Sequence, residues 1–206
     1  MHYFPHKRLL LLLLALLCCS LPALAARNIL ILGDSLSAGY GIPLETAWPS
    51  LLQARLQRQG PDYNVVNLSI SGETTAGGRS RLPAALNEHK PSLVLLALGA
   101  NDGLRGLPLS QTRDNLVTMI QVIRNSGARV VLVGMRIPPN YGPYARQFDA
   151  LYGELSRDLR LPLVKFLLEG VADQPQLFQP DGLHPVAAAQ PRILDNIWPV
   201  LQPQLR

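Results

Sequence analysis

Cysteine is almost absent from this chain of 206 residues, which contains only Cys18 and Cys19. Both lie at the end of an apolar run at residues 9–19, which follows two basic residues and precedes the small residues around Ala25. A basic start, about 11 apolar residues and a small-residue cleavage site form the pattern of a secretory signal peptide. We therefore predict that residues 1–25 are cleaved and that the mature chain has neither a disulfide nor a thiol nucleophile.

The sequence also lacks an apolar run of about 20 residues, the length that a helix needs to cross a bilayer. A lipid anchor on a cysteine is the alternative use of the N-terminal segment. It is disfavoured because Leu17, rather than a small residue, precedes Cys18, and Cys18 itself precedes Cys19. We expect export across the inner membrane into the periplasm, or beyond the cell, without a stable membrane anchor.

Charged residues are few, at 16% of the chain, and no run of lysine or arginine occurs. The formal charge of +5 becomes +3 once Lys7 and Arg8 are removed with the signal peptide. A small, dispersed charge of this kind predicts a solvated basic surface rather than a nucleic-acid partner. The length of the mature chain, residues 26–206, fits one domain with a sizeable core, which we expect to be a monomer.

Short, uniformly apolar runs alternate with segments of helical periodicity. The predicted strands are 29–32, 63–68, 92–98, 130–135 and 163–166. The predicted helices are 45–59, 79–89 with Pro83 in its first turn, 110–125 with Ser110 as N-cap, 144–159 and 186–201. Such alternation predicts a three-layer α/β/α fold with a five-stranded parallel sheet in the flavodoxin-like order 2-1-3-4-5. The crossovers between strands should be right-handed.

The first strand ends at Gly33 and is followed at once by Asp34 and Ser35. Ligands of open parallel sheets bind beyond the carboxyl ends of the strands, which makes Ser35 a candidate nucleophile by position. Alternatively, Asp34 or Ser35 merely caps the next helix. The stretch alone leaves both readings open.

Histidine is scarce, and this narrows the choice of a catalytic base. The predicted signal peptide removes two of the four histidines, and His89 lies at a polar helix end where we expect it to face solvent. His184 remains, with Asp181 three residues before it. A carboxylate at that spacing can orient an imidazole as in a serine triad. The alternative for this segment is a tight turn that opens a helix.

Two further strand ends carry groups that could donate hydrogen bonds to an oxyanion. Gly72 has no Cβ, so its N–H can approach a substrate closely. Asn101 offers a neutral side-chain amide, and the Ser35 N–H is a third donor. Asp102 is poorly suited to this role, because its negative charge would destabilise a nearby oxyanion. Each loop alone could be a turn, but four such loops at one sheet edge favour a hydrolytic site.

Four blocks of this sequence resemble those of the SGNH, or GDSL, hydrolase family: residues 33–37, Gly72, residues 99–102 and residues 181–184. Within that family the chain is similar to secreted bacterial multifunctional thioesterases, arylesterases and lysophospholipases. The resemblance covers essentially the whole mature chain. It implies that Ser35 is the nucleophile, His184 the base and Asp181 its orienting partner. It also implies an oxyanion hole made by Ser35, Gly72 and Asn101.

The same resemblance implies a serine esterase that hydrolyses small-molecule esters and thioesters of medium to long acyl chains without metal or cofactor. Two alternatives remain at this point. One is an acetylesterase of the same family acting on acetylated carbohydrate or peptidoglycan. The other is a non-catalytic domain that binds a small ligand at the strand ends.

Apolar residues on the loops that follow the candidate nucleophile and Asn101 suit an acyl groove. These candidate substrate-binding residues are Tyr40, Ile42, Leu104, Leu107, Pro108, Leu109 and Tyr141. The alternative is that they fold down on the core. We expect Asp34 to bind neighbouring loop amides rather than substrate.

Overall fold

The structure, a computed structural model, describes residues 27–59 and 62–205, so the predicted signal peptide lies outside the described residues. The strands are β1 (Arg27–Gly33), β2 (Tyr63–Asn67), β3 (Leu93–Ala97), β4 (Arg129–Val133) and β5 (Leu163–Val164). They form one sheet in the order β2-β1-β3-β4-β5, and every neighbouring pair is parallel. The predicted five-stranded parallel sheet and its strand order are confirmed.

The centre of the sheet is fully buried. Residues 29–32 of β1 and all of β3 are 0% exposed, and Ile31 lies beside Leu95 in the register that joins the two strands. A parallel sheet covered on both faces needs apolar side chains on both, which is why these strands show no alternation. The uniform apolar runs therefore mark the sheet centre.

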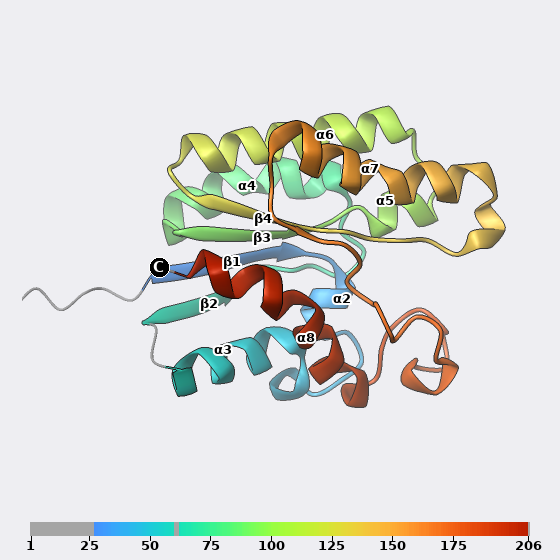
Figure 1. The fold of residues 1–206 in the computed structure, drawn as a ribbon, viewed down its shortest axis with the longest axis horizontal. Helices are drawn as coiled ribbons and strands as arrows, with labels where there is room; N and C mark the ends of the chain where they lie inside the picture. The colour runs from blue at the N-terminus through green and yellow to red at the C-terminus, as the bar shows by residue number, and fades with distance from the viewer. Residues whose placement is uncertain (1–26, 60–61, 206) are drawn as a thin grey trace, which may run out of the picture.

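Helices cover both faces of the sheet (Figure 1). On one side lie α4 (Thr75–His89), α6 (Leu109–Asn125) and α7 (Pro143–Leu159); on the other lie α3 (Trp48–Gln59) and α8 (Gln190–Leu201). The predicted three-layer arrangement is thus confirmed. Across the second layer, the Gln190 side-chain oxygen accepts a hydrogen bond from the Trp48 N–H at 3.0 Å, which joins α8 to the start of α3.

Several short elements of the structure were not predicted. Two short α-helices, α2 (Ser35–Ala38) and α5 (Ala100–Leu104), follow β1 and β3. The 3-10 turns are η1 (Leu44–Thr46), η2 (Pro139–Tyr141), η3 (Pro175–Leu177), η4 (Ala187–Ala189) and η5 (Gln202–Gln204). A helix of four or five residues is too short to show a periodicity in the sequence.

Helix α4 begins at Thr75, earlier than predicted, because the Thr74 side chain accepts the Gly77 N–H at 3.4 Å and caps it. Pro83 therefore lies in the helix interior rather than in its first turn. The carbonyl that Pro83 leaves without an intrahelical donor belongs to Arg79, and both residues are exposed. Water can satisfy that carbonyl, so the proline is tolerated there.

Other boundaries also differ from the prediction. Ser110 is not an N-cap: α6 begins at Leu109 after Pro108, which makes no side-chain capping bond. Strand β5 is only two residues long. The last helix begins at Gln190, after the 3-10 turn η4.

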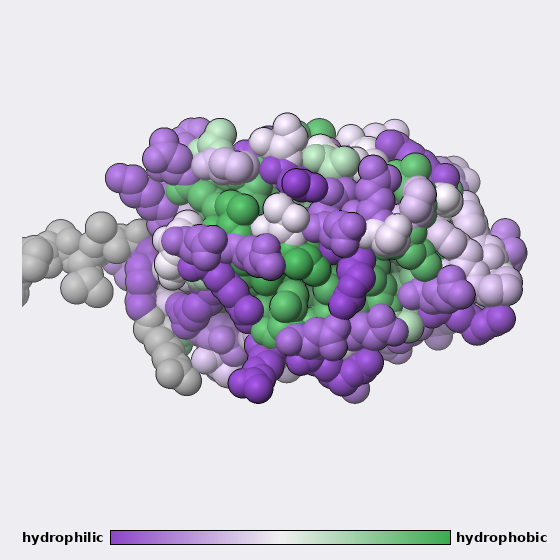
Figure 2. Space-filling model, turned by 90° about the horizontal axis from the view of Figure 1, so that it is seen from above, coloured by the Kyte–Doolittle hydropathy of each residue, from purple (hydrophilic) through white to green (hydrophobic). Residues whose placement is uncertain are grey.

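Figure 2 views the molecule from the side of α6 and α7, where polar residues surround a central band of hydrophobic ones. Among residues 27–59 and 62–205, no helix combines the length and the apolar character needed to cross a lipid bilayer.

Candidate active site

Ser35 is presented by a sharp strand-to-helix junction. β1 ends at Gly33, Asp34 is the N-cap of α2, and its Oδ1 accepts the Leu36 N–H at 3.0 Å. Ser35 is the first residue of α2, so the cap is Asp34 and the Ser35 hydroxyl is left for another partner. Gly33 has no positive φ; it is required because a Cβ there would lie 2.8 Å from the Ser37 Oγ.

The partner of Ser35 is His184. The Ser35 Oγ lies 2.8 Å from the His184 Nε2, although 149 residues separate the two in the chain. On the other side of the ring, the His184 Nδ1 lies 2.7 Å from the Asp181 Oδ2. The three side chains form a continuous hydrogen-bonded series, which is the geometry of a base held between a hydroxyl and a carboxylate.

Asp181 is itself fixed by its own turn. Its second oxygen accepts the backbone N–H groups of Leu183 at 2.9 Å and His184 at 3.0 Å. The hydrogen bond to the His184 side chain, followed by these backbone bonds, lowers the pKa of Asp181 to about 2. Asp181 is therefore ionised at neutral pH and able to stabilise a protonated imidazole.

Asn101 joins two of the loops at this edge. It lies on α5, and its side-chain amide donates to the Glu73 carbonyl at 3.1 Å and, more weakly, to the Asp34 Oδ2 at 3.4 Å. Gly72, the residue before Glu73, has a φ of 78°, a left-handed conformation that favours glycine. Its carbonyl accepts a hydrogen bond from Arg105 at 3.0 Å. The segments of Ser35, Gly72 and Asn101 are thus held together.

Asp34 directly precedes Ser35 in the chain and is 0% exposed. Burial raises the pKa of this carboxyl to about 6, against the opposing effect of the Leu36 N–H bond and of His184. Its two oxygens accept the Leu36 N–H and the Asn101 amide, as expected for a residue that binds loop amides.

A second buried carboxylate was not recognised as a structural centre from the sequence. Asp102 is 2% exposed and accepts the backbone N–H of Thr75 at 2.9 Å as well as its hydroxyl. Asn115 donates to the Thr75 hydroxyl at 3.1 Å, and Arg79 donates to Asn115 at 3.2 Å. This network ties α4, α5 and α6 together beneath the Gly72 and Asn101 loops. The residues of this network are far apart in the chain, so no local sequence pattern predicts it.

A cleft of about 510 Å³ opens beside Ser35 and His184. Its walls are mostly apolar: Leu36, Ala100, Leu104, Ile137, Pro138, Pro139, Phe166, Leu168, Ala172, Phe178 and Leu183. Asp34, Asn101, Arg136, Asp173 and Gly182 complete the lining. The wall residues from 166 to 178 come from an irregular segment that carried no recognisable motif, and sequence reasoning missed them.

Only some of the residues predicted to bind substrate lie at the cleft. Leu104 lines the cleft, and the Tyr141 hydroxyl donates to the Leu104 carbonyl at 2.9 Å. The Tyr40 ring packs on the His184 ring with 4.4 Å between centroids. Neither tyrosine is among the residues that line the cleft, and the same holds for Ile42, Leu107 and Pro108.

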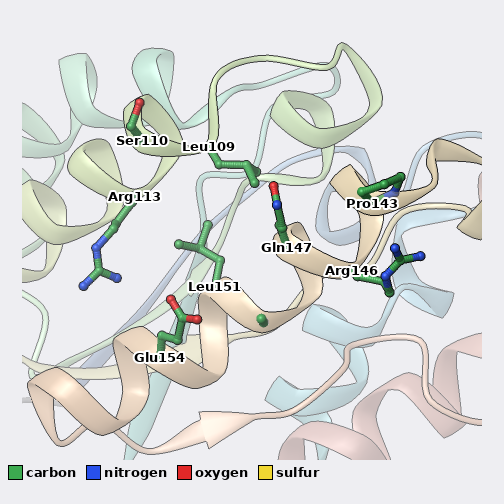
Figure 3. Close-up of a pocket in the computed structure, with 9 residues that line it drawn as sticks. Leu109, Ser110, Arg113, Pro143, Arg146, Gln147, Leu151 and Glu154 are labelled. Atoms are coloured by element: carbon green, nitrogen blue, oxygen red, sulfur yellow. The ribbon is translucent and has the colours of Figure 1, made fainter.

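Leu109 lines a different cavity, of about 490 Å³, between the start of α6 and α7 (Figure 3). Arg113, Gln147 and Leu151 also contribute to this cavity, and none of its lining residues lines the cleft at Ser35. In the described part of the chain, no group of three or more His, Cys, Asp or Glu side chains is placed to hold a metal ion.

Comparison with known proteins gives consistent matches. Residues 31–190 match the family model described as the GDSL-like Lipase/Acylhydrolase family. The chain is 50% identical to Esterase TesA of Pseudomonas aeruginosa over 88% of this chain and 90% of the relative. A crystal structure of TesA superimposes with a TM-score of 0.85 and 50% identity, and covers 87% of this chain and 100% of that one.

Two further relatives carry related names. The chain is 48% identical to an arylesterase of Vibrio mimicus, over 91% of this chain and 94% of the relative. It is 45% identical to the Escherichia coli protein named thioesterase 1/protease 1/lysophospholipase L1, over 88% of this chain and 86% of the relative.

Burial of Asp34 predicts a pH-dependent stability. Its pKa of about 6 in the folded chain exceeds the ordinary value of about 3.9. Its contribution to the free energy of unfolding is therefore fully present below pH ~4 and is lost as the pH rises through ~6. A shift of about two units corresponds to roughly 3 kcal/mol.

In Asp34→Asn this dependence should disappear, so the wild type should lose up to ~3 kcal/mol relative to the variant between pH 4 and pH 7. Urea unfolding at several pH values measures the difference. Asp114→Asn, at an exposed position, is the control. The same pH-dependent difference in both variants would contradict the assignment to burial.

Proposed function

The chain belongs to the GDSL-like lipase/acylhydrolase family of SGNH hydrolases and is a carboxylic ester hydrolase, and from this we propose that Ser35, His184 and Asp181 carry its reaction. It is therefore an enzyme rather than the non-catalytic binding domain that the sequence left open. The observation that supports the proposal most strongly is the hydrogen-bonded series Ser35–His184–Asp181 at the edge of an apolar cleft.

The first step forms an acyl-enzyme. The His184 Nε2 removes the proton of the Ser35 hydroxyl as the Ser35 Oγ attacks the acyl carbonyl carbon. The 2.8 Å separation of these two atoms is within the range for direct proton transfer. Asp181 holds the ring with its Nδ1–H toward the carboxylate, and it stabilises the imidazolium that forms.

The carbonyl oxygen becomes negatively charged in the tetrahedral intermediate. We assign its stabilisation to the backbone N–H groups of Ser35 and Gly72 and to the side-chain amide of Asn101. The 3.4 Å contact between Asn101 and Asp34 is a weak hydrogen bond, so that N–H costs little to redirect toward an oxyanion. The stronger bond to Glu73 meanwhile keeps the amide in place.

Collapse of the intermediate transfers the proton from His184 to the leaving alkoxide or thiolate and leaves the acyl group on Ser35. Water then attacks the acyl-enzyme, with His184 accepting its proton and returning it to the Ser35 oxygen. The products are a carboxylic acid and an alcohol or thiol. Apart from the attacking water, each proposed step uses groups of this chain and needs no metal or cofactor.

We propose that the substrates are small-molecule esters and thioesters with medium to long acyl chains. The cleft of about 510 Å³ is lined mainly by apolar side chains, which suits an acyl chain of several carbons better than an acetyl group on a sugar. Relatives named an arylesterase and a thioesterase/lysophospholipase support the same substrate classes.

We also propose that the chain is cleaved after Ala25 and exported to the periplasm or outside the cell. There it would act as a monomer, without a nucleic-acid partner or a membrane anchor. Only the sequence pattern of residues 1–25 supports the cleavage site. N-terminal sequencing of the exported protein should give Ala26 as the first residue. An uncleaved or lipid-modified N-terminus would contradict this part of the proposal.

Removing the reacting groups should abolish turnover without unfolding the protein. We expect Ser35→Ala and His184→Ala to lower kcat by roughly 10⁴ or more. Asn101→Ala should lower kcat by roughly 10²–10³, because one oxyanion donor is lost. Steady-state kinetics with a p-nitrophenyl ester measure both effects, with Asn87→Ala at an exposed position of α4 as control. Normal turnover by the Asn101 variant would remove it from the oxyanion hole.

The acyl-chain preference is tested separately. Across p-nitrophenyl esters from acetate to palmitate, kcat/KM should rise from acetate to octanoate, because additional methylene groups bury apolar surface in the cleft. A sharp preference for acetate would contradict the proposed substrate class and favour an acetylesterase.

A further inference from the structure

The contact between Ser35 and His184 joins two segments that no sheet pairing holds together. Ser35 follows β1, whereas His184 lies in the long segment between β5 and α8, drawn in orange to red in Figure 1. Proton transfer requires the reacting atoms of the two side chains to lie within about 3 Å of each other. A displacement of ~1 Å can reduce the rate of reaction about 100-fold. Some contact beyond the reacting pair must therefore fix the His184 segment against α2.

Gln179 makes that contact. Its side-chain Nε2 donates to the carbonyl of Tyr40, at 2.8 Å, and to the carbonyl of Pro185, at 3.2 Å. A primary amide carries two N–H groups, so both bonds can form at once. Tyr40 belongs to the loop after Ser35, and Pro185 directly follows His184. One side chain thus bridges the two segments that bring the proposed nucleophile and base together.

The backbone of Gln179 is bound to the same turn. Its N–H donates to the His184 carbonyl at 2.8 Å, and its carbonyl accepts the Gly182 N–H at 2.9 Å. Phe178 and Pro185 also form an isolated antiparallel bridge. Gln179 is therefore anchored within the turn that carries Asp181 and His184, and its side chain extends from that turn to Tyr40.

Gly41 supplies an independent indication that the bridge is built to fit. A Cβ on Gly41 would lie 2.2 Å from the Gln179 Oε1, and its φ of 71° is in the region that glycine prefers. The Gln179 amide therefore packs directly against the backbone after Tyr40, in space that only glycine leaves open.

Tyr40 connects the bridge back to the imidazole. Its ring packs on the His184 ring with centroids 4.4 Å apart and planes inclined by 38°. The residue whose carbonyl Gln179 holds is thus the residue whose ring covers His184. Movement of the Tyr40 loop would release this ring face together with the bond to Gln179.

We propose that Gln179 is a positioning residue for the ester hydrolysis: through Tyr40 and Pro185 it holds His184 at reacting distance from Ser35. The proposal rests on the assignment of Ser35 and His184 as nucleophile and base. Gln179 is not among the residues that line the cleft, and its side chain binds the carbonyls of Tyr40 and Pro185 rather than the side chain of Ser35 or His184. Its effect is therefore on the alignment of the pair.

Gln179→Met tests this role, since methionine has an unbranched side chain of similar length but no N–H donor. With a short ester such as p-nitrophenyl butyrate, kcat should fall about tenfold or more while KM stays within about twofold. Gln179→Glu, which directs a carboxylate at the two carbonyls, should lower kcat at least as much. The matched control is Gln176→Met, because Gln176 is exposed on the same segment and its amide donates only to Gln174 at 3.1 Å.

The fold is checked by circular dichroism and thermal unfolding of the same samples. Folded Gln179→Met with an unchanged kcat, or a rise in KM alone, would overturn the positioning role. Failure of both Gln179 variants to fold would assign Gln179 to stability and would likewise overturn it. Ser35→Ala is measured alongside: turnover by that variant would refute the proposed function itself, whereas an inactive Ser35→Ala with a normal Gln179→Met refutes only the positioning role.

Discussion

The buried pairing of β1 with β3 determines where the loops of the proposed active site lie. Because these strands are parallel, both end at the same edge of the sheet, and Ser35 and Asn101 lie there on the short helices that follow. β2 ends at that edge as well and delivers the Gly72 loop. The proposed active site lies at this edge because of the direction of the strands, as in other open α/β sheets.

Two buried carboxylates fix the loops at this edge of the sheet through the hydrogen bonds that they accept. Asp34 accepts the Leu36 N–H and the Asn101 amide, and Asp102 accepts both donors of Thr75. A buried carboxylate is tolerable only when hydrogen bonds satisfy it, so Asp34 fixes the Leu36 N–H and Asp102 fixes Thr75. Asn101 is held mainly by its stronger bond to the Glu73 carbonyl. The two carboxylates thus hold the loops around the proposed oxyanion hole.

The sequence could predict the sheet, because residues 29–32 and 93–97 are apolar throughout and strand-end residues follow from strand direction. It could also single out Ser35, Asn101, Asp181 and His184, since each follows or lies near a recognisable block. The cleft wall at Phe166 and Phe178 and the bridge at Gln179 could not be predicted, because irregular segments have no period and their contacts span more than a hundred residues. The early start of α4 was missed for a local reason: the cap is Thr74, ahead of two glycines that weaken a helical pattern.

Ser35, activated by His184, is the proposed nucleophile of the reaction. Reaction with a fluorophosphonate probe, followed by mass spectrometry of the digested protein, tests this assignment. We expect a single modified residue, Ser35, loss of esterase activity in proportion to labelling, and greatly slowed labelling in His184→Ala. Full inactivation with the label on another residue, or active protein that the probe does not modify at Ser35, would contradict it.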